Sequence, residues 1–343
     1  TIRVAFIGCG RRGHASAKGI SLEERCEVVA LADPNEEAAK DLASEFGFES
    51  ATVYSDYHDM LGAEQPDFVV ASLWTPLHLP VFRAAARAGV RAFQSEKPMA
   101  ATWGDAEEMA AIAEETGCQL TFCHQRRFCP GNRRVRELLA EGRFGDVLSM
   151  DLYAPCGLLD CGTHSIDQAM SFNNESPGRW VMGALDLSEV KASFDVPTET
   201  VATGLIVFEN GVRAQIQCRG PDKDMGTGVR VNATNGLVEV DWNGRIKRCH
   251  VFDDPDWSFP EPGFDPKNPE TVAKMNKALV ADTLDALEAG REPELSHRKA
   301  IRTTEIIFAL YQSALTHRRI ELPLESPDNA LTRYVETVGI ALA

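Results

Sequence analysis

The chain has 343 residues, which suits two domains of ordinary size rather than one. Hydrophobic residues make up 44% of it and charged residues 25%, as in a folded globular protein. A net charge of −16 repels phosphate backbones, so nucleic acid is not an expected partner, and local donors must hold any anionic ligand.

Short apolar runs alternate with helical patterns from Ile2 to Phe122. The predicted strands are Ile2–Ile7, Glu27–Ala32, Phe68–Leu73, Val90–Gln94 and Gln119–Phe122, and the predicted helices are Arg12–Ile20, Asn35–Phe46, Leu79–Ala88 and Thr102–Thr116. Continuous apolar strands between helices are typical of a parallel sheet with both faces covered. We therefore predict an α/β domain with a parallel sheet over residues 1–123.

The pattern changes to longer strands with short turns after Gly145. The predicted strands are Val147–Tyr153, Val201–Phe208, Val212–Cys218, Gly228–Ala233 and Gly236–Trp242, and two late helices are predicted at Pro269–Ala289 and His297–His317. Asn210-Gly211 is a strong hairpin signal, because both residues tolerate the positive φ of a tight turn. We predict an α+β domain over residues 124–343 with a large, mostly antiparallel open sheet, whose late helices can pack back on the first domain.

Cysteine usage and hydropathy bear on the compartment. The nine cysteines are an odd number without regular spacing, which favours reduced thiols in a cytoplasmic protein. No apolar run approaches the roughly 20 residues that cross a bilayer. Thr1–Ile7 leads straight into a strand pattern, so we expect neither a signal peptide nor a membrane partner.

Gly8, Gly10 and Gly13 form G-x-G-x-x-G between a predicted strand and a predicted helix. The first glycine permits a tight turn, the second lets the backbone approach a pyrophosphate, and the third allows close helix–strand packing. The helix N-terminus offers unpaired N–H groups to the phosphates. The segment predicts the dinucleotide site of a Rossmann domain, and the alternative interpretation is an ordinary turn.

Asp33 ends the second predicted strand, 20 residues beyond Gly13. A carboxylate there accepts hydrogen bonds from the adenosine ribose and repels a 2′-phosphate, which favours NAD over NADP. The alternative is that Asp33 caps a helix with Pro34 as its first residue.

Lys97 lies in Ser95-Glu96-Lys97-Pro98, after the strand Val90–Gln94 and so at the carboxyl end of the sheet, where α/β folds bind ligands. Desolvation in a crevice lowers the pKa of a lysine and suits it to proton exchange. The alternative is a surface Glu-Lys pair before a turn proline.

Asp160 and His164 stand around the expected start of a helix near Gly162, with Asp167 one turn beyond His164. An imidazole and a carboxylate presented together suit proton transfer, which must accompany hydride removal from an alcohol. The alternative is a packed histidine and a helix cap.

Together these motifs resemble the Gfo/Idh/MocA family, named for glucose–fructose oxidoreductase, inositol dehydrogenase and a rhizopine-catabolism protein. The matching segments, in chain order, are Gly8–Gly13, Thr75–His78, Glu96–Pro98, His124–Phe128, Asp160–Asp167 and Leu287–Pro293. Leu77 departs from the asparagine that the family usually has in its cofactor-side loop.

The resemblance implies reversible oxidation of a hydroxyl on a sugar, inositol or related polyol with NAD. It implies Lys97, Asp160 and His164 as the catalytic residues, with His164 as base, Lys97 polarising the oxygen, Asp160 orienting the substrate, and a cis bond before Pro98. The implied cofactor contacts are Gly8, Cys9, Gly10, Arg11, Arg12, Gly13, Asp33, Thr75, Pro76, His78, Glu96 and Lys97. Lys97, Arg126, Asp160 and His164 are the candidate substrate contacts, and relatives often form homodimers or homotetramers.

Three other functions compete with a simple dehydrogenase. A zinc site would draw on Cys123, His124, Cys129, Cys156, Cys161 and His164, but only Cys156 and Cys161 have a usual spacing, so we expect no metal. Some relatives hold NAD tightly and oxidise a sugar only transiently, to cleave a glycosidic bond or to reduce a second sugar. Others are non-catalytic sensors, which tend to lose the lysine and histidine kept here.

These motifs do not identify the substrate. We expect loops such as Asp222–Thr227 and Asp253–Asn268 to set it. Arg127, Trp257 and Phe259 are further residues that could reach a ligand, although a packing or surface role is the better expectation for each.

Overall fold

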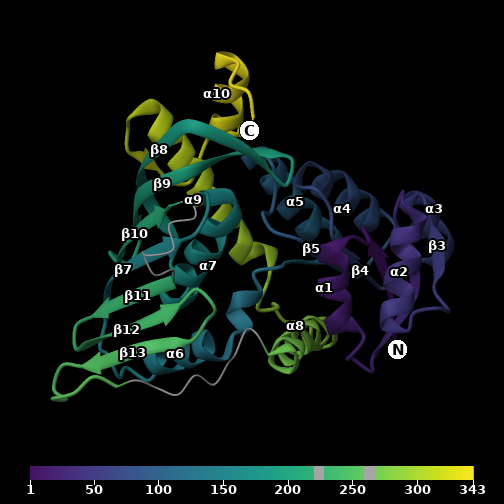
Figure 1. Cartoon of the computed structure of the whole chain (residues 1–343), viewed down its shortest axis with the longest axis horizontal. Coiled ribbons are helices and arrows are strands. Elements are labelled where there is room, and N and C mark those ends of the chain that lie inside the picture. Colours follow the sequence, from purple (N-terminus) through teal and green to yellow (C-terminus); the bar gives the residue numbers. More distant parts are fainter. Residues whose placement is uncertain (220–227, 259–267, 343) are drawn as a thin grey trace. The chain divides into compact units, whose positions relative to one another are not determined.

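The computed structural model describes residues 1–219, 228–258 and 268–342. These divide into two compact units (Figure 1). The first comprises Thr1–Ala100, Asp105–Gln125 and Lys267–Ala300, and the second Ala101–Gly104, Arg126–Pro266 and Ile301–Ala343. The Asp222–Thr227 loop and residues 259–267 of the Asp253–Asn268 loop, two loops that we expected to set the substrate, lie outside the described residues, and so does Phe259.

The first unit is a six-stranded parallel sheet in the order β3-β2-β1-β4-β5-β6. This is the strand order of a Rossmann domain, and it confirms the predicted fold class. Its elements are β1 (Ile2–Ile7), α1 (Arg11–Ile20), β2 (Cys26–Ala32), α2 (Glu36–Phe46), β3 (Thr52–Tyr54), α3 (Tyr57–Glu64), β4 (Phe68–Ala71), η1 (Thr75–Leu77), α4 (His78–Arg87), β5 (Ala92–Ser95), α5 (Trp103–Thr116), β6 (Gln119–Phe122) and α8 (Pro269–Ala289).

The central strands of this sheet are buried, and they fix the edge at which their carboxyl ends lie. Every residue of β4 and β5 is buried, as expected for strands covered on both faces. The neighbouring strands run in register, with Ala71 beside Ser95 and Ser95 beside Phe122. The loops that follow β1, β4 and β5 therefore leave the sheet along one edge.

The first compact unit runs to Gln125 and also contains α8, a helix from late in the chain. The reason is close packing of α8 on α1 at Gly19, where an added Cβ would lie 2.8 Å from the carbonyl oxygen of Asn276. A helix late in the chain thus completes the first core.

The second unit holds an eight-stranded sheet in the order β13-β12-β11-β7-β10-β9-β8-β14. Its elements are η2 (Gln125–Phe128), α6 (Pro130–Ala140), β7 (Val147–Ala154), η3 (Leu158–Gly162), α7 (Thr163–Phe172), β8 (Gly178–Ser193), β9 (Val196–Phe208), β10 (Arg213–Cys218), β11 (Gly228–Ala233), β12 (Gly236–Asp241), β13 (Ile246–Val251), α9 (His297–Thr316), β14 (Ile320–Glu321) and α10 (Ala330–Val338). Only β7 and β10 pair in parallel among the described strands, which confirms a mostly antiparallel sheet.

One face of this sheet is covered by helices. α6 contacts β12 and β13, α7 contacts β7, β10 and β11, and Gly183 and Gly204 let Leu310 of α9 approach the sheet closely. On β8 and β9 the other face exposes apolar side chains, including Met182 and Val201. Within the described ranges, no helix is both long and apolar enough to cross a membrane.

Candidate functional site

The glycine turn between β1 and α1 shows three different uses of glycine. Gly8 has φ +87°, and an added Cβ would lie 2.4 Å from the carbonyl oxygen of Ser72. At Gly13 an added Cβ would lie 2.6 Å from the carbonyl oxygen of Gly8. At Gly10 it would meet no protein atom within 4 Å, so this backbone is open to a ligand. The turn is therefore shaped for a dinucleotide rather than being an ordinary turn.

The start of α1 offers its N–H groups to such a ligand. Gly10 is the N-cap and has no side chain to bond them, and the first turn contains no acidic residue. The N-terminal partial charge of the helix is therefore available to phosphate oxygens. Arg11, which opens the helix, is exposed.

Asp33 lies directly beside this turn, at the end of β2. Its carboxylate accepts hydrogen bonds from the Cys9 and Asn35 backbone N–H groups, at 2.8 Å each. The N-cap of α2 is Asn35 and the helix begins at Glu36, so the alternative role of Asp33 as a helix cap before Pro34 is wrong. The carboxylate is half-buried next to the glycine turn, where a ribose would stand.

Glu96 and Lys97 follow β5 at the same edge of the sheet. Glu96 is buried and accepts from Arg12, with Nε at 3.0 Å and Nη2 at 2.7 Å. This ion pair ties the loop to α1, so the alternative of a surface Glu-Lys pair is wrong. The Lys97–Pro98 peptide is cis, as the resemblance implied. Lys97 is partly exposed.

Four buried side-chain oxygens near the ends of β4 and β5 have no hydrogen-bond partner among the described residues. They are Ser72 Oγ, Thr75 Oγ1, Gln94 Oε1 and Ser95 Oγ. Buried polar atoms are nearly always bonded to protein, water or a ligand, so these oxygens leave hydrogen-bonding capacity for a polar ligand near this edge of the sheet. The open backbone at Gly10 and the start of α1, together with these oxygens, fit a nicotinamide dinucleotide.

The loop from Thr75 to His78 is anchored by its histidine. His78 is buried, and its two ring nitrogens lie 3.2 Å from the carbonyl oxygens of Met99 and Leu73. Burial lowers the pKa of His78. The structure thus uses His78 to hold the loop, while Pro76 and Leu77 are exposed. Cofactor contacts by this loop stay a prediction.

In the second unit, Asp160 and His164 lie on consecutive turns. Asp160 is in the π-helical turn η3, and His164 is the second residue of α7, as the sequence predicted. Ser193 Oγ donates to the Asp160 carboxylate at 3.3 Å. His164 is buried, and its ring meets the indole of Trp242 edge-on, with centroids 6.1 Å apart.

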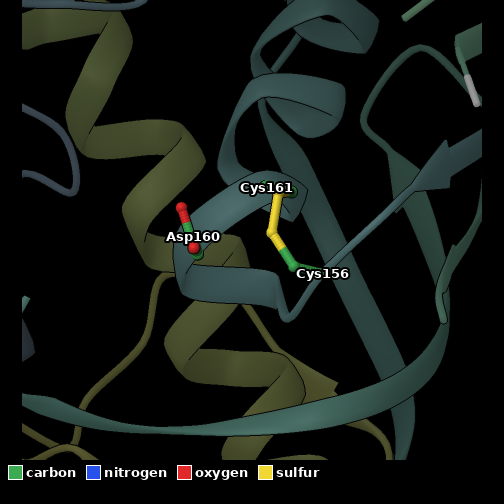
Figure 2. Close-up of side chains that lie close together, drawn as sticks. All are labelled: Cys156, Asp160 and Cys161. Carbon is green, nitrogen blue, oxygen red and sulfur yellow. A yellow bond between two sulfur atoms is a disulfide. The ribbon is translucent and has the colours of Figure 1, made fainter. Parts of the chain in front are cut away.

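The expectation that the cysteines are all reduced is wrong for one pair. Cys156 and Cys161 form a disulfide beside Asp160 (Figure 2). The η3 turn brings their Cα atoms to 5.2 Å, which is within bridging range. Among the described residues, Cys156, Asp160 and Cys161 are the one cluster of three candidate metal ligands, and the bridged cysteines offer it no thiolate. The other seven cysteines form no disulfide.

A buried carboxyl group anchors the start of η3. Glu199 of β9 accepts from the Leu158 backbone N–H at 2.6 Å and from Tyr311 Oη at 2.8 Å. Burial raises the pKa of Glu199. No sequence signal predicts the contact between Glu199 and Tyr311, because the two residues are distant in the chain and neither belongs to a motif.

Two adjacent arginines near the start of the second unit have different surroundings. Arg127 is buried and donates to Asp167 at 2.8 Å and to Glu175 at 2.5 Å. Arg126 stacks on Trp242, with Cζ 3.7 Å from the ring centroid. Asp167 therefore has a structural role as the buried ion-pair partner of Arg127. The sequence analysis missed Trp242 as a candidate site residue, although an aromatic residue at the end of a predicted strand was a visible signal.

Comparison with known proteins gives a consistent result. Residues 2–124 match the family model described as "Oxidoreductase family, NAD-binding Rossmann fold". The D-apiose dehydrogenase of Paraburkholderia graminis is 29% identical, over 96% of this chain and 92% of that protein. D-xylose 1-dehydrogenase (NADP(+)) 2 of Haloferax volcanii is 25% identical, over 86% of this chain and 92% of that protein.

Solved structures share the fold over nearly the whole chain. The aldose-aldose oxidoreductase of Caulobacter crescentus, crystallised with glycerol, has a TM-score of 0.78. The match covers 94% of this chain and 100% of that chain at 22% identity, which shows a common fold alone.

Proposed function

We propose that this chain is an NAD(H)-dependent dehydrogenase of the Gfo/Idh/MocA family, a proposal supported by the match of residues 2–124 to that family's model and by the dehydrogenases among its relatives. Its reaction is hydride transfer between the nicotinamide and a hydroxyl-bearing carbon of a sugar, inositol or related polyol. The observation that carries the proposal is the carboxyl edge of the first sheet, where the open Gly10 backbone and four unpartnered buried oxygens accompany Lys97.

Each catalytic residue has a distinct task in this reaction. Bound NAD supplies the hydride acceptor. His164 takes the hydroxyl proton, so that a carbonyl can form at the carbon that loses its hydride. The Lys97 ammonium donates to the reacting oxygen, and Asp160, itself held by Ser193, orients the substrate through its hydroxyls.

Substitution of the catalytic residues tests these roles. We expect Lys97→Ala and His164→Ala each to lower turnover by about 10²-fold or more, the usual contribution of a proton-transfer group. NADH affinity should stay nearly unchanged. The measurements are NADH formation with a panel of sugars, inositols and sugar acids, and cofactor titration by fluorescence.

Exposed residues of the same types serve as controls for these variants. Lys40→Ala and His58→Ala on the first unit should behave as wild type, because both side chains are exposed. Normal turnover in either catalytic variant would refute the assigned roles.

We propose NAD rather than NADP because the Asp33 carboxylate stands where a 2′-phosphate would be. Asp33→Asn keeps an acceptor for the Cys9 N–H while removing the charge. NADP affinity should rise about tenfold or more in this variant, equal to about 1.4 kcal/mol, and NAD affinity should fall. Unchanged affinities for both cofactors in a binding titration would refute this cofactor choice.

The proposal extends to assembly and location. We propose a homodimer or homotetramer that pairs through the exposed apolar face of β8 and β9, where Met182 and Val201 lie. We place the enzyme in the cytoplasm, because the proposed reaction uses NAD(H) and seven of the nine cysteines form no disulfide.

A further inference from the structure

The guanidinium of Arg126 lacks the partners that its neighbour has. Arg127 is neutralised by Asp167 and Glu175. Arg126 takes part in no ion pair within the described part of the chain, and its Nε is buried without a hydrogen-bond partner. Its polar atoms therefore remain available, while one face of the group rests on Trp242.

The surroundings of Arg126 do not compensate its charge. Burial lowers the pKa of Arg126 to about 10. The nearest influential carboxylate is Asp241, which already accepts from Arg245 Nε at 2.8 Å and from two backbone N–H groups. Taking most of a cation out of water costs free energy, so a protein that keeps Arg126 without a dedicated carboxylate among the described residues gains from it in another way.

The position of Arg126 connects it to the proposed base. Trp242 carries the Arg126 guanidinium on its ring face, and the His164 imidazole meets the same ring edge-on. Arg126 and His164 thus contact one indole, and all three residues belong to the second unit. Asn132 donates to the Arg126 carbonyl oxygen at 2.8 Å and fixes the backbone there.

We propose that Arg126 binds a carboxylate of the substrate, so that the enzyme acts on hydroxy acids of the aldonate and uronate class rather than on neutral sugars. This inference rests on the proposed function and names its substrate class. A planar guanidinium matches a carboxylate with two parallel hydrogen bonds. One cation balances the single charge of a carboxylate, whereas a phosphate dianion needs more. In a chain of net charge −16, such a local donor is required to hold an anion.

Binding to the enzyme saturated with NADH tests the inference directly. Calorimetric titrations would use matched pairs of D-glucuronate with D-glucose, D-galacturonate with D-galactose, and D-gluconate with D-glucitol, with glucose 6-phosphate as the phosphate probe. We expect the acid to bind about tenfold or more tightly than its neutral partner in at least one pair, a difference of about 1.4 kcal/mol. Glucose 6-phosphate should bind more weakly than that acid.

Two variants and a control identify the residue responsible. Arg126→Ala should lower the affinity for the acid about tenfold or more, and Arg126→Lys should lower it less, because the charge remains without the planar fork. Arg134→Ala removes an exposed arginine of α6 in the same unit and should change nothing. The unfolding midpoint of Arg126→Ala is measured alongside, to show that any loss of affinity does not come from unfolding.

The outcomes separate this inference from the proposed function. It is overturned if no acid binds, if the neutral partner or the phosphate binds more tightly throughout, or if Arg126→Ala matches Arg134→Ala. Oxidation of neutral sugars but not of acids would overturn the substrate class and leave the dehydrogenase standing. Acid binding through Arg126 without any cofactor reduction would support the inference and contradict the dehydrogenase.

Discussion

At the scale of a single residue, a substitution at Gly10 tests cofactor binding without disturbing the fold. An added methyl group there meets no protein atom within 4 Å, and the residue has φ −73°, which alanine adopts readily. Gly10→Ala should therefore fold like wild type. The methyl group would occupy the space of the pyrophosphate, so NADH affinity should fall about tenfold or more, equal to about 1.4 kcal/mol.

The matched control for Gly10→Ala is Gly8→Ala in the same turn. Here φ is +87° and the added Cβ would clash with the Ser72 carbonyl oxygen, so we expect a lower unfolding midpoint. Thermal melts and NADH titrations measure both variants. Full NADH affinity in a folded Gly10→Ala protein would show that the turn does not hold the cofactor.

The surroundings of motif residues were predictable, because the residue types and spacing of a motif define its local structure. Gly8, Gly10 and Gly13 each occupy the surroundings that the spacing predicts, and Asp160 and His164 lie on the expected turns. Partners that tertiary packing supplies were not predictable. Glu96 pairs with Arg12, 84 residues away in the chain, and Arg126 stacks on Trp242. No local sequence pattern encodes either contact.

At the scale of an element, the buried Glu199 carboxyl group fixes the start of the η3 turn by a hydrogen bond. Its hydrogen bonds to Leu158 N–H and Tyr311 Oη fix the segment that carries Asp160. Glu199→Ala should leave both groups unpaired and cost about 1–3 kcal/mol for each. Glu199→Gln keeps an acceptor and a polar partner, so it should cost less.

The raised pKa of Glu199 also predicts a pH dependence of stability. A carboxyl group whose pKa is higher in the folded state contributes most below its unfolded pKa of about 4.3, and this contribution is lost as the pH rises through the folded pKa. Glu199→Gln cannot titrate. Its unfolding free energy relative to wild type should therefore rise with pH, by at most about 1.4 kcal/mol per unit.

Urea unfolding of both proteins between about pH 5 and pH 8 measures this difference. A constant difference across that range would contradict a titrating buried carboxyl group at Glu199. If the unfolding free energy of Glu199→Gln minus that of wild type falls as the pH rises, the direction of the shift is contradicted.

The sequence analysis predicted some elements with their exact bounds and missed others. β1, β6, β11 and α8 have the predicted bounds, because clear apolar patterns end at turn or capping residues. The structure adds β3, α3, α6, β8, β13, β14 and α10, which the sequence analysis did not predict. In β8 only Val181 and Val190 are buried, so the strand depends on pairing with β9 rather than on an apolar pattern of its own.

At the scale of the whole molecule, the exposed face of β8 and β9 predicts self-association. Met182 is 48% exposed and Val201 36% exposed on neighbouring strands. Light scattering after gel filtration should give a mass of at least twice the 37.6 kDa of one chain. Met182→Lys should shift the protein toward the monomer, because a charge would be buried in the interface.

Leu22→Lys is the control for this variant, because Leu22 is 41% exposed and belongs to the first unit rather than to the second sheet. It should keep the wild-type mass. A monomeric wild-type protein would refute pairing through this face.

Transfer of a labelled hydride tests the central claim of an NAD(H)-dependent dehydrogenase most directly. The enzyme would be incubated with NAD and with sugars, inositols and sugar acids deuterated at carbon, and the reduced cofactor analysed by mass spectrometry. We predict NADH that carries one deuterium from at least one substrate, with none formed by His164→Ala. Absence of reduced cofactor with every substrate, or reduced cofactor without the label, would contradict the account.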